Sequence, residues 1–239
     1  MSEGPRVFAP LIAQYPGHLF VVGGGVAIFH LATSRVVICS AVDRHGTTYY
    51  FLPKGRRDAG EESGPGAERE GYEESGYRNR LLPLPTQHRQ PQAYPRVAAP
   101  PMTAEPVWTQ LMPLGSKQYI VYWYIAETLP PALDAALDTD DDAGAPYTPP
   151  PPFPRSMTLR ERISLDPHGY EPVHHAGTGV DANEQMYQSH LVSVDEAVAK
   201  LGCNGVMADV VLQGWKGIQN RLAMEEDAAT WTSPEAIIA

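Results

Sequence analysis

Apolar and β-branched residues come in runs along the first half of the chain, with short polar breaks between them. Residues 18–30 and 35–42 are two such runs, and the short break between them predicts two strands joined as a hairpin. Residues 47–53 predict a third strand, which Pro53 ends. Residues 117–128 mix aromatic with β-branched side chains and predict the strongest strand of the chain.

Helical periodicity appears later in the chain. Residues 184–201 predict a strand that runs into a helix, with Ser193 as its N-cap and Glu196 as the other half of a capping box. Residues 204–222 predict an amphipathic C-terminal helix that glycine weakens in two places. Because strands and helices alternate, we expect an α/β fold and a single domain over residues 1–239.

Two proline-rich segments interrupt this pattern. Residues 83–102 contain too much proline for regular structure. Residues 128–168 are first acidic and then proline-rich, with few apolar residues, and predict a mobile insertion, of which residues 130–158 are expected to be dispensable for activity. Within it, residues 146–154 fit either a plain linker or a ligand for the proline-binding domain of a partner.

Composition narrows the classes of function. The 239 residues carry a formal net charge of −10, which argues against a broad nucleic-acid surface. No stretch approaches the roughly 18 uninterrupted apolar residues of a membrane span, and the N-terminus lacks the pattern of a leader. Cys39 and Cys203 match no metal spacing and are expected to be buried thiols. These features favour the cytoplasm, with the nucleus as the alternative.

Three consecutive glycines, residues 23–25, invite comparison with a dinucleotide-binding loop. That motif needs glycine or alanine where Ile28 stands, and here the apolar run continues as a strand instead of turning into a helix. We therefore interpret these glycines as a bulge or a close backbone approach within the first strand.

The densest charge in the chain follows the third strand, and its spacing predicts a helix over about residues 66–75 that Gly76 ends. At about 100° per residue, Glu70, Glu73 and Glu74 would share an arc of about 100° on one helix face. Carboxylates this close repel one another, and a hard divalent cation reverses that cost because it prefers oxygen ligands. The spacing therefore predicts a site for Mg²⁺ or Mn²⁺.

A longer pattern surrounds these glutamates, with fixed residue types at fixed intervals. Its members are Gly55, Glu61, Arg69, Glu70, Glu73, Glu74 and Gly76. This pattern resembles the signature of the Nudix hydrolase family. Gly71 departs from it, since an apolar residue is usual at that position, whereas Tyr77 satisfies the final apolar position. The resemblance implies an α/β/α sandwich with a mixed sheet over most of the chain outside the proline-rich insertion.

The resemblance also implies roles for these residues in cleaving a phosphoanhydride with water. Glu73 and Glu74 would be the principal ligands of Mg²⁺ or Mn²⁺. Glu70 would be a further ligand or the general base for the attacking water. Hydrolysis of this kind needs no other cofactor.

Other residues of the pattern would support the metal ligands. Arg69 and Glu61 would orient the helix and the catalytic loop, and the carbonyl of Gly55 would be an additional metal ligand. Lys54 and Arg56 stand where phosphate contacts could form, with a solvated loop as the alternative for the arginine.

One more carboxylate could come from a later loop. Glu184 is the candidate, with Asp181 behind it, and the alternative is that both are plain surface residues.

The function implied is hydrolysis of a small-molecule phosphoanhydride, and the alternative class is a binding module that keeps the fold without the chemistry. Residues 52–55, LPKG, resemble family members that act on dinucleoside polyphosphates or on diphosphoinositol polyphosphates. We favour the dinucleoside polyphosphate, because inositol pyrophosphates need a wide basic surface and a nucleobase can stack on aromatic side chains. The basic residues near the pattern are Lys54, Arg56, Arg57, Arg78 and Arg80. The candidate stacking residues are Tyr15, Tyr119, Tyr122 and Tyr124.

Overall fold

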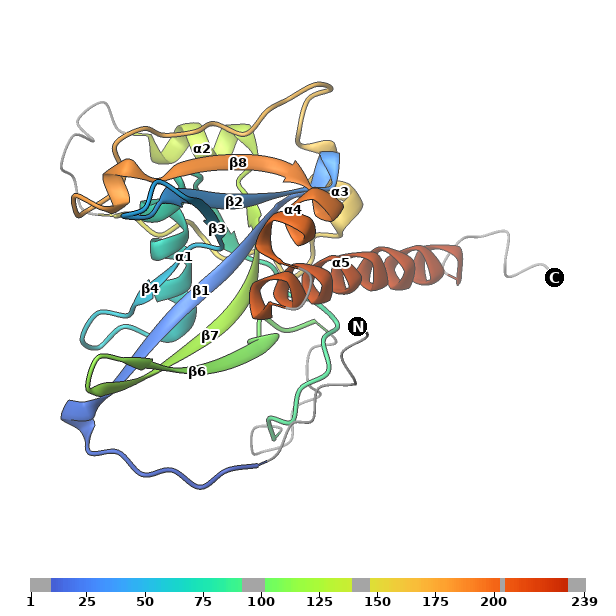
Figure 1. Cartoon of the computed structure of the whole chain (residues 1–239). Helices are drawn as coiled ribbons and strands as arrows, with labels where there is room; N and C mark the ends of the chain where they lie inside the picture. Colours follow the sequence, from blue (N-terminus) through green and yellow to red (C-terminus); the bar gives the residue numbers. More distant parts are fainter. Residues whose placement is uncertain (1–9, 92–101, 139–146, 203–204, 232–239) are drawn as a thin grey trace.

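The computed structural model describes four segments of the chain, residues 10–91, 102–138, 147–202 and 205–231. Within them, eight strands form one mixed sheet (Figure 1). In chain order the strands are β1 (Phe20–His30), β2 (Arg35–Val42), β3 (Thr48–Phe51), β4 (Lys54–Arg56), β5 (Asn79–Leu81), β6 (Trp108–Leu114), β7 (Lys117–Thr128) and β8 (Gln188–Ser193). β1 and β7 run parallel, with Phe20 beside Gln118 at one end and Phe29 beside Glu127 at the other.

Helices cover both faces of the sheet. They are α1 (Ser63–Ser75), α2 (Pro131–Leu137), α3 (Leu159–Ser164), α4 (Val194–Leu201) and α5 (Val206–Trp231). The alternation of side chains along β1 divides the core between these faces. Val26 and Ile28 pack with Ala67 of α1, whereas Ala27 and Phe29 belong to a larger cluster with residues of α4 and α5. The α/β class with a mixed sheet between helices is therefore confirmed.

The main elements predicted from the pattern are present. The first two strands form the expected hairpin, with Phe29 opposite Val36. β7 covers the residues predicted as the strongest strand. The acidic helix begins at Ser63, a few residues earlier than expected, and Gly76 ends it in the left-handed conformation, with φ 70°.

The cap of α4 is simpler than predicted. The Ser193 hydroxyl accepts a hydrogen bond from the Glu196 backbone N–H at 3.2 Å, as expected. The Glu196 carboxylate instead lies 3.7 Å from Lys200 Nζ, so a single serine cap replaces the predicted box.

The glycines of the C-terminal helix have a packing role that the sequence did not reveal. A Cβ atom added to Gly214 would lie 2.6 Å from Ile125 Cδ1, and one added to Gly217 would lie 2.9 Å from Leu84 Cδ1. These glycines let α5 approach the sheet closely, and packing there offsets their low helix propensity. α5 also continues past the predicted end to Trp231.

The sequence pattern missed three strands, β4, β5 and β6. β4 and β5 span only three residues each, too few to show alternation. β6 contains Pro113, which is tolerated because β6 pairs with β7 alone, as an edge strand.

The consecutive glycines of β1 lie where other backbone segments approach the strand closely, as expected. A Cβ atom on Gly24 would lie 2.7 Å from the backbone nitrogen of Ala67 in α1. One on Gly23 would collide with the carbonyl oxygen of Gly55 and the hydroxyl of Tyr119. The glycines therefore set the distance between β1, α1 and β4, which carry the site described below.

Residues 128–168 were expected to be irregular and short of apolar anchors, and the described part of that segment corrects this expectation, whereas its mobility and dispensability stay predictions. The described part contains α2 and α3, and Leu159 is fully buried. The Phe153 ring lies between two guanidinium groups, with Arg80 Cζ 5.0 Å and Arg221 Cζ 4.6 Å from its centroid. The prediction from composition failed because buried ion pairs, together with a few apolar residues, stabilise this segment. A count of apolar residues does not include such ion pairs. The most acidic stretch, residues 139–146, lies outside the described residues.

Two predictions from composition can also be compared with the structure. Cys39 is buried as expected, and burial raises the pKa of its thiol, whereas Cys203 lies outside the described residues. Within the described segments, no helix combines the length and the apolar character needed to cross a membrane.

Candidate active site

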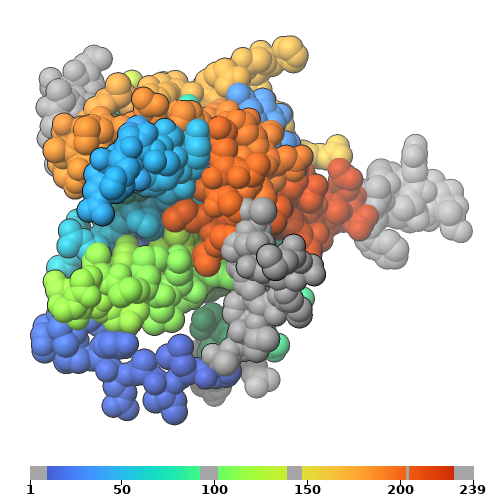
Figure 2. Space-filling model, in the orientation of Figure 1, coloured from blue at the N-terminus to red at the C-terminus, as the bar shows by residue number. Residues whose placement is uncertain are grey.

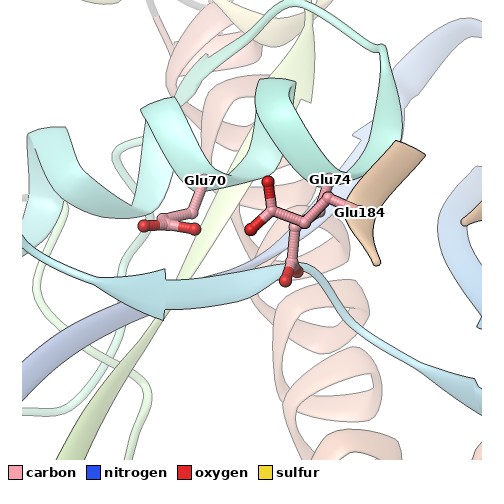
Figure 3. Close-up of side chains that lie close together, drawn as sticks. All are labelled: Glu70, Glu74 and Glu184. Carbon is pink, nitrogen blue, oxygen red and sulfur yellow. The ribbon is translucent and has the colours of Figure 1, made fainter. Parts of the chain in front are cut away.

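Three carboxylates from two distant parts of the chain meet beside α1 (Figure 3). Glu70 and Glu74 lie one turn apart on the helix face that looks toward β4. Glu184 opens the short 3₁₀ helix η3 (Glu184–Met186). Each of the three offers a carboxylate oxygen within 4.8 Å of the other two. Glu70 and Glu74 are buried, and Glu184 is partly exposed.

β4 holds the two helix glutamates in place. A Cβ atom on Gly55 would collide with the Glu70 carboxylate, so glycine is what leaves room for that side chain. The backbone N–H of Lys54 donates to Glu74 Oε2 at 2.7 Å. The Gly55 carbonyl accepts a hydrogen bond from the Tyr119 hydroxyl at 2.8 Å, and its role as a metal ligand stays a prediction.

Arg69 links the acidic residues of α1 to the loop before the helix. Its Nε and Nη2 donate to the two oxygens of Glu61 at 3.1 and 3.0 Å. Its Nη1 donates to Glu70 Oε1 at 3.0 Å and to Glu73 Oε2 at 2.7 Å. Nη2 also reaches the carbonyl of Arg56 at 3.0 Å. Such a bridge can orient the helix relative to the loop, which is the role expected of Arg69 and Glu61.

Glu73 lies outside the group of three carboxylates, although the sequence predicts it to be a principal ligand. Its side chain lines the same cleft, where it pairs with Arg69. The geometry favours Glu70, Glu74 and Glu184 as the first set of donors, and a ligand role for Glu73 stays a prediction.

The carboxylates open into a cleft of about 1200 Å³. Lys54 and Arg56, the predicted phosphate contacts, line it, and so does Asp181 beside Glu184. The cleft therefore presents acidic and basic side chains to the same ligand, as a site for metal and phosphate together requires.

Burial dominates the proton affinity of the clustered carboxylates. It raises the pKa of Glu74 to about 8, although the Lys54 N–H and ammonium oppose the shift. Burial also raises the pKa of Glu70 to about 7, against the nearby charge of Arg69. For Glu61, burial alone would raise the pKa, but the hydrogen bonds from Arg69 and from the Asp58 backbone outweigh it and the pKa is lowered.

The donor set fits a hard divalent cation. Three carboxylates converge within 4.8 Å, and two of them are buried groups whose ionised forms are unfavourable without a counter-charge. Oxygen donors of this kind suit Mg²⁺ or Mn²⁺. Glu70, Glu74 and Glu184 are thus the residues that would hold the ion.

These pKa shifts predict how the stability of the metal-free protein depends on pH. Glu70 and Glu74 have folded-state pKa values of about 7 and 8, above the ordinary 4.5. Their contribution to the stability of the folded state is fully present below pH 4.5. It is lost as pH rises through 7 and 8, because between pH 4.5 and these values only the folded state keeps the two protons bound. With chelator present, we expect the wild-type protein to lose on the order of a few kcal/mol more than Glu74→Gln between about pH 5 and pH 9. Parallel denaturant titrations would measure this, and equal losses in the two proteins would contradict it.

The loop that carries Glu184 is fastened to the C-terminal end of α1. The Thr178 hydroxyl donates to the Glu73 carbonyl at 2.9 Å, and the His175 N–H donates to the Gly76 carbonyl at 2.8 Å. Within the loop, Glu184 Oε2 accepts from the Val180 N–H at 2.8 Å. These bonds bring Glu184 to α1, beside Glu70 and Glu74, and a ligand role for it stays a prediction.

Two functional contacts were not predicted from the sequence. Tyr119 was considered only as a stacking surface, but it hydrogen-bonds the Gly55 carbonyl. Thr178 carries no motif, and only its position against α1 reveals it. Gly71, the departure from the family pattern, makes room for Asn79, since a Cβ atom there would lie 2.7 Å from Asn79 Nδ2.

Several solved structures resemble this one in shape, at low identity. The chain is similar to a NUDIX hydrolase from Nitrosomonas europaea, with 13% identity, 82% of this chain and 89% of that chain covered, and a TM-score of 0.43. It is also similar to an Ap4A hydrolase from C. elegans, seen as a binary complex, with 13% identity, coverage of 81% and 93%, and a TM-score of 0.39. A MutT protein from Methanosarcina mazei Go1 has 10% identity, coverage of 82% and 94%, and a TM-score of 0.37.

Comparisons of the sequence with family models and with curated proteins gave no match. Structural scores and identities this low carry no conclusion about activity. Inference about function therefore rests on the residues of the chain itself.

Proposed function

We propose that the protein is a metal-dependent pyrophosphohydrolase of the Nudix type, which cleaves a phosphoanhydride bond of a small molecule with water. The observation that supports this most strongly is the convergence of Glu70, Glu74 and Glu184 in a cleft that Lys54 and Arg56 also line. In a binding module without catalytic activity, the buried, mutually repelling carboxylates of Glu70 and Glu74 would only destabilise the fold.

Each residue of the site has a role in this proposal. Glu70, Glu74 and Glu184 would hold Mg²⁺ or Mn²⁺, which lowers the pKa of bound water and neutralises charge on the phosphoryl oxygens. Glu70 would serve either as a ligand of the ion or as the general base for the attacking water. Lys54 and Arg56 would contact the phosphates.

Arg69 and Glu61 would position this machinery, and Arg69 also lines the cleft. Their two-oxygen pair fixes the catalytic loop against α1. The bond from Arg69 to Glu70 then limits the directions in which that carboxylate can turn.

For the substrate we propose a dinucleoside polyphosphate over a diphosphoinositol polyphosphate. Two of the basic residues that would favour an inositol pyrophosphate are engaged elsewhere. Arg80 is buried with its Nε 2.7 Å from Glu127 Oε1, and Arg78 is buried with its Nε 3.5 Å from Asp134 Oδ1. Fewer basic side chains are therefore free near the cleft to bind the phosphates that surround an inositol ring.

A screen that separates and identifies the phosphorylated products would test the proposed reaction, because cleavage of a dinucleoside polyphosphate or a nucleotide sugar by water gives two phosphorylated products and no free phosphate. Dinucleoside polyphosphates, nucleotide sugars, nucleoside triphosphates and inositol pyrophosphates would be compared with Mg²⁺, with Mn²⁺ and with chelator. We expect turnover that chelator abolishes, with diadenosine tetraphosphate among the preferred substrates. Absence of metal-dependent hydrolysis for every phosphoanhydride would contradict the proposed function. A kcat/KM about tenfold higher for a diphosphoinositol polyphosphate would contradict only the choice of substrate.

Two further parts of the proposal concern the setting of the enzyme. Residues 148, 149, 151 and 152 are exposed, so the proline-rich stretch 146–154 keeps the alternatives of linker and ligand for a proline-binding partner. A location in the cytoplasm, or in the nucleus, and the lack of a nucleic-acid partner also stay predictions.

A further inference from the structure

The proline-rich segment before α3 is held to the fold at both of its ends. Residues 147–154 have the sequence YTPPPPFP. The Tyr147 ring lies 5.9 Å from the Tyr72 ring of α1, measured between centroids. At the other end, the Phe153 ring is buried between the two guanidinium groups described above, from β5 and α5. In Figure 1 the segment, in yellow, leads to α3, and in Figure 2 yellow atoms reach the surface at the right-hand edge, near α3.

The proline content gives this segment the backbone of a polyproline II helix. Every residue from Thr148 to Phe153 is a proline or precedes one. The proline ring holds φ at about −65°, and a following proline disfavours the α-helical region for the residue before it. The resulting helix is left-handed, with about three residues per turn and a rise of about 3.1 Å per residue. Residues 147–154 accordingly belong to no α-helix or strand.

Burial along the segment follows this three-residue period. Every third residue is buried or partly buried and forms the edge that faces the fold, and these residues are Tyr147, Pro150 and Phe153. The positions between them are exposed, and they are Thr148, Pro149, Pro151 and Pro152. Two of the three edges of the helix therefore face the solvent, and Pro149 and Pro152 share one of them.

The outward positions are what distinguish this segment from a plain linker. A linker needs only the inward residues, because these attach the segment to the fold, and polar residues would serve at the other positions. Three of the four outward positions are proline instead. Between Pro149 and Pro152 they form an exposed apolar ridge of about 9 Å on a fixed backbone. Such a ridge is what the aromatic-lined grooves of proline-binding domains recognise.

Two further features favour binding at this ridge. Because both ends are held by buried or partly buried rings, the segment has little conformational freedom left to lose when a partner binds. Arg155 follows the prolines and is exposed, so its guanidinium group can pair with a carboxylate of a partner.

We propose that residues 148–155 are a docking site for a protein domain that has an aromatic-lined groove with carboxylates at one end. Pro149 and Pro152 enter the groove from one edge of the helix, and Pro151 contacts it from the next. Arg155 pairs with the carboxylates. The docking site is independent of the proposed hydrolysis, because none of these residues lines the cleft that holds the catalytic carboxylates.

A panel of purified SH3, WW and EVH1 domains tests the docking site. Each isotope-labelled domain would be titrated with the full-length protein and followed by NMR. We expect at least one domain to bind, with resonance shifts that map to the aromatic residues of its groove. Combining Pro149→Ala with Pro152→Ala should weaken this binding about tenfold or more. Arg155→Gln lies outside the ridge and should weaken it about two- to fivefold, since it removes one exposed ion pair.

Matched controls come from exposed residues elsewhere on the described surface. Pro167 is exposed beyond α3, and Pro167→Ala should leave the affinity for the domain unchanged. Arg44 is exposed between β2 and β3, and Arg44→Gln serves in the same way for Arg155→Gln. Melting temperatures would check that every variant is folded. Hydrolysis by the docking-site variants should equal that of the wild-type protein.

The outcomes decide the docking site separately from the enzyme assignment. The docking site would be overturned if no domain of the panel bound the wild-type protein at about 1 mM. It would also be overturned if the paired proline substitutions weakened binding no more than Pro167→Ala does. Binding to a domain without any phosphoanhydride hydrolysis by the wild-type protein would support the docking site and contradict only the proposed function.

Discussion

Glu74→Gln is expected to lower turnover by about a hundredfold or more at saturating Mg²⁺ while the fold stays intact. The amide oxygen of glutamine can still accept the hydrogen bond from the Lys54 N–H, so the local structure has a replacement for the lost contact. What the amide cannot supply is the negative charge that a hard cation requires. Removing one of two neighbouring buried carboxylates should also make the metal-free protein slightly more stable at neutral pH.

Kinetics and metal binding would be measured together on this variant. Glu62→Gln is the matched control, since Glu62 precedes the same helix but is exposed and does not line the cleft. It should retain wild-type turnover and Mn²⁺ affinity. Near wild-type hydrolysis by Glu74→Gln at saturating Mg²⁺ would show that the metal site is wrongly assigned.

Glu73→Gln tests the residue that the sequence predicts as a principal metal ligand but that lies outside the group of three carboxylates. It too should lower turnover, because it removes either a ligand or the partner of Arg69. If Mn²⁺ affinity falls as far as in Glu74→Gln, Glu73 is a ligand, as the family resemblance implies. If affinity holds while turnover falls, its role is to position Arg69.

The spacing of residues along α1 was enough to predict the acidic face, because helical geometry alone places Glu70 and Glu74 together. The third carboxylate was harder to predict. Glu184 reaches α1 only through hydrogen bonds such as that from Thr178 to the Glu73 carbonyl, and no local pattern records a contact between distant segments. β4 was missed for a related reason, since three residues give no periodicity, although its Gly55 was identified through the motif.

The insertion shows where composition fails as a guide. Its described residues are few in apolar side chains, yet Arg162 in α3, near its C-terminal end, is fully buried. Arg162 Nε lies 2.6 Å from Glu127 Oε2 of β7, and its Nη1 lies 2.8 Å from Asp166 Oδ1. Its Nη2 also donates to the Thr128 carbonyl at 2.8 Å. A low count of apolar residues predicts disorder only when the charged side chains stay exposed to water. In this segment the charged group of Arg162 is buried and paired instead.

Arg162→Met should therefore destabilise the protein by about 3–5 kcal/mol, because it leaves Glu127 and Asp166 buried with fewer counter-charges. Methionine keeps much of the side-chain volume, so the loss would reflect charge more than a cavity. Arg160→Met on the same helix is the control, since Arg160 is exposed and its pair with Glu226 is a surface one, worth at most about 1 kcal/mol. Denaturant unfolding of both variants would measure the difference. Equal midpoints for Arg162→Met and Arg160→Met would mean that α3 is not docked on the sheet, and the insertion would then be as dispensable as its composition suggests.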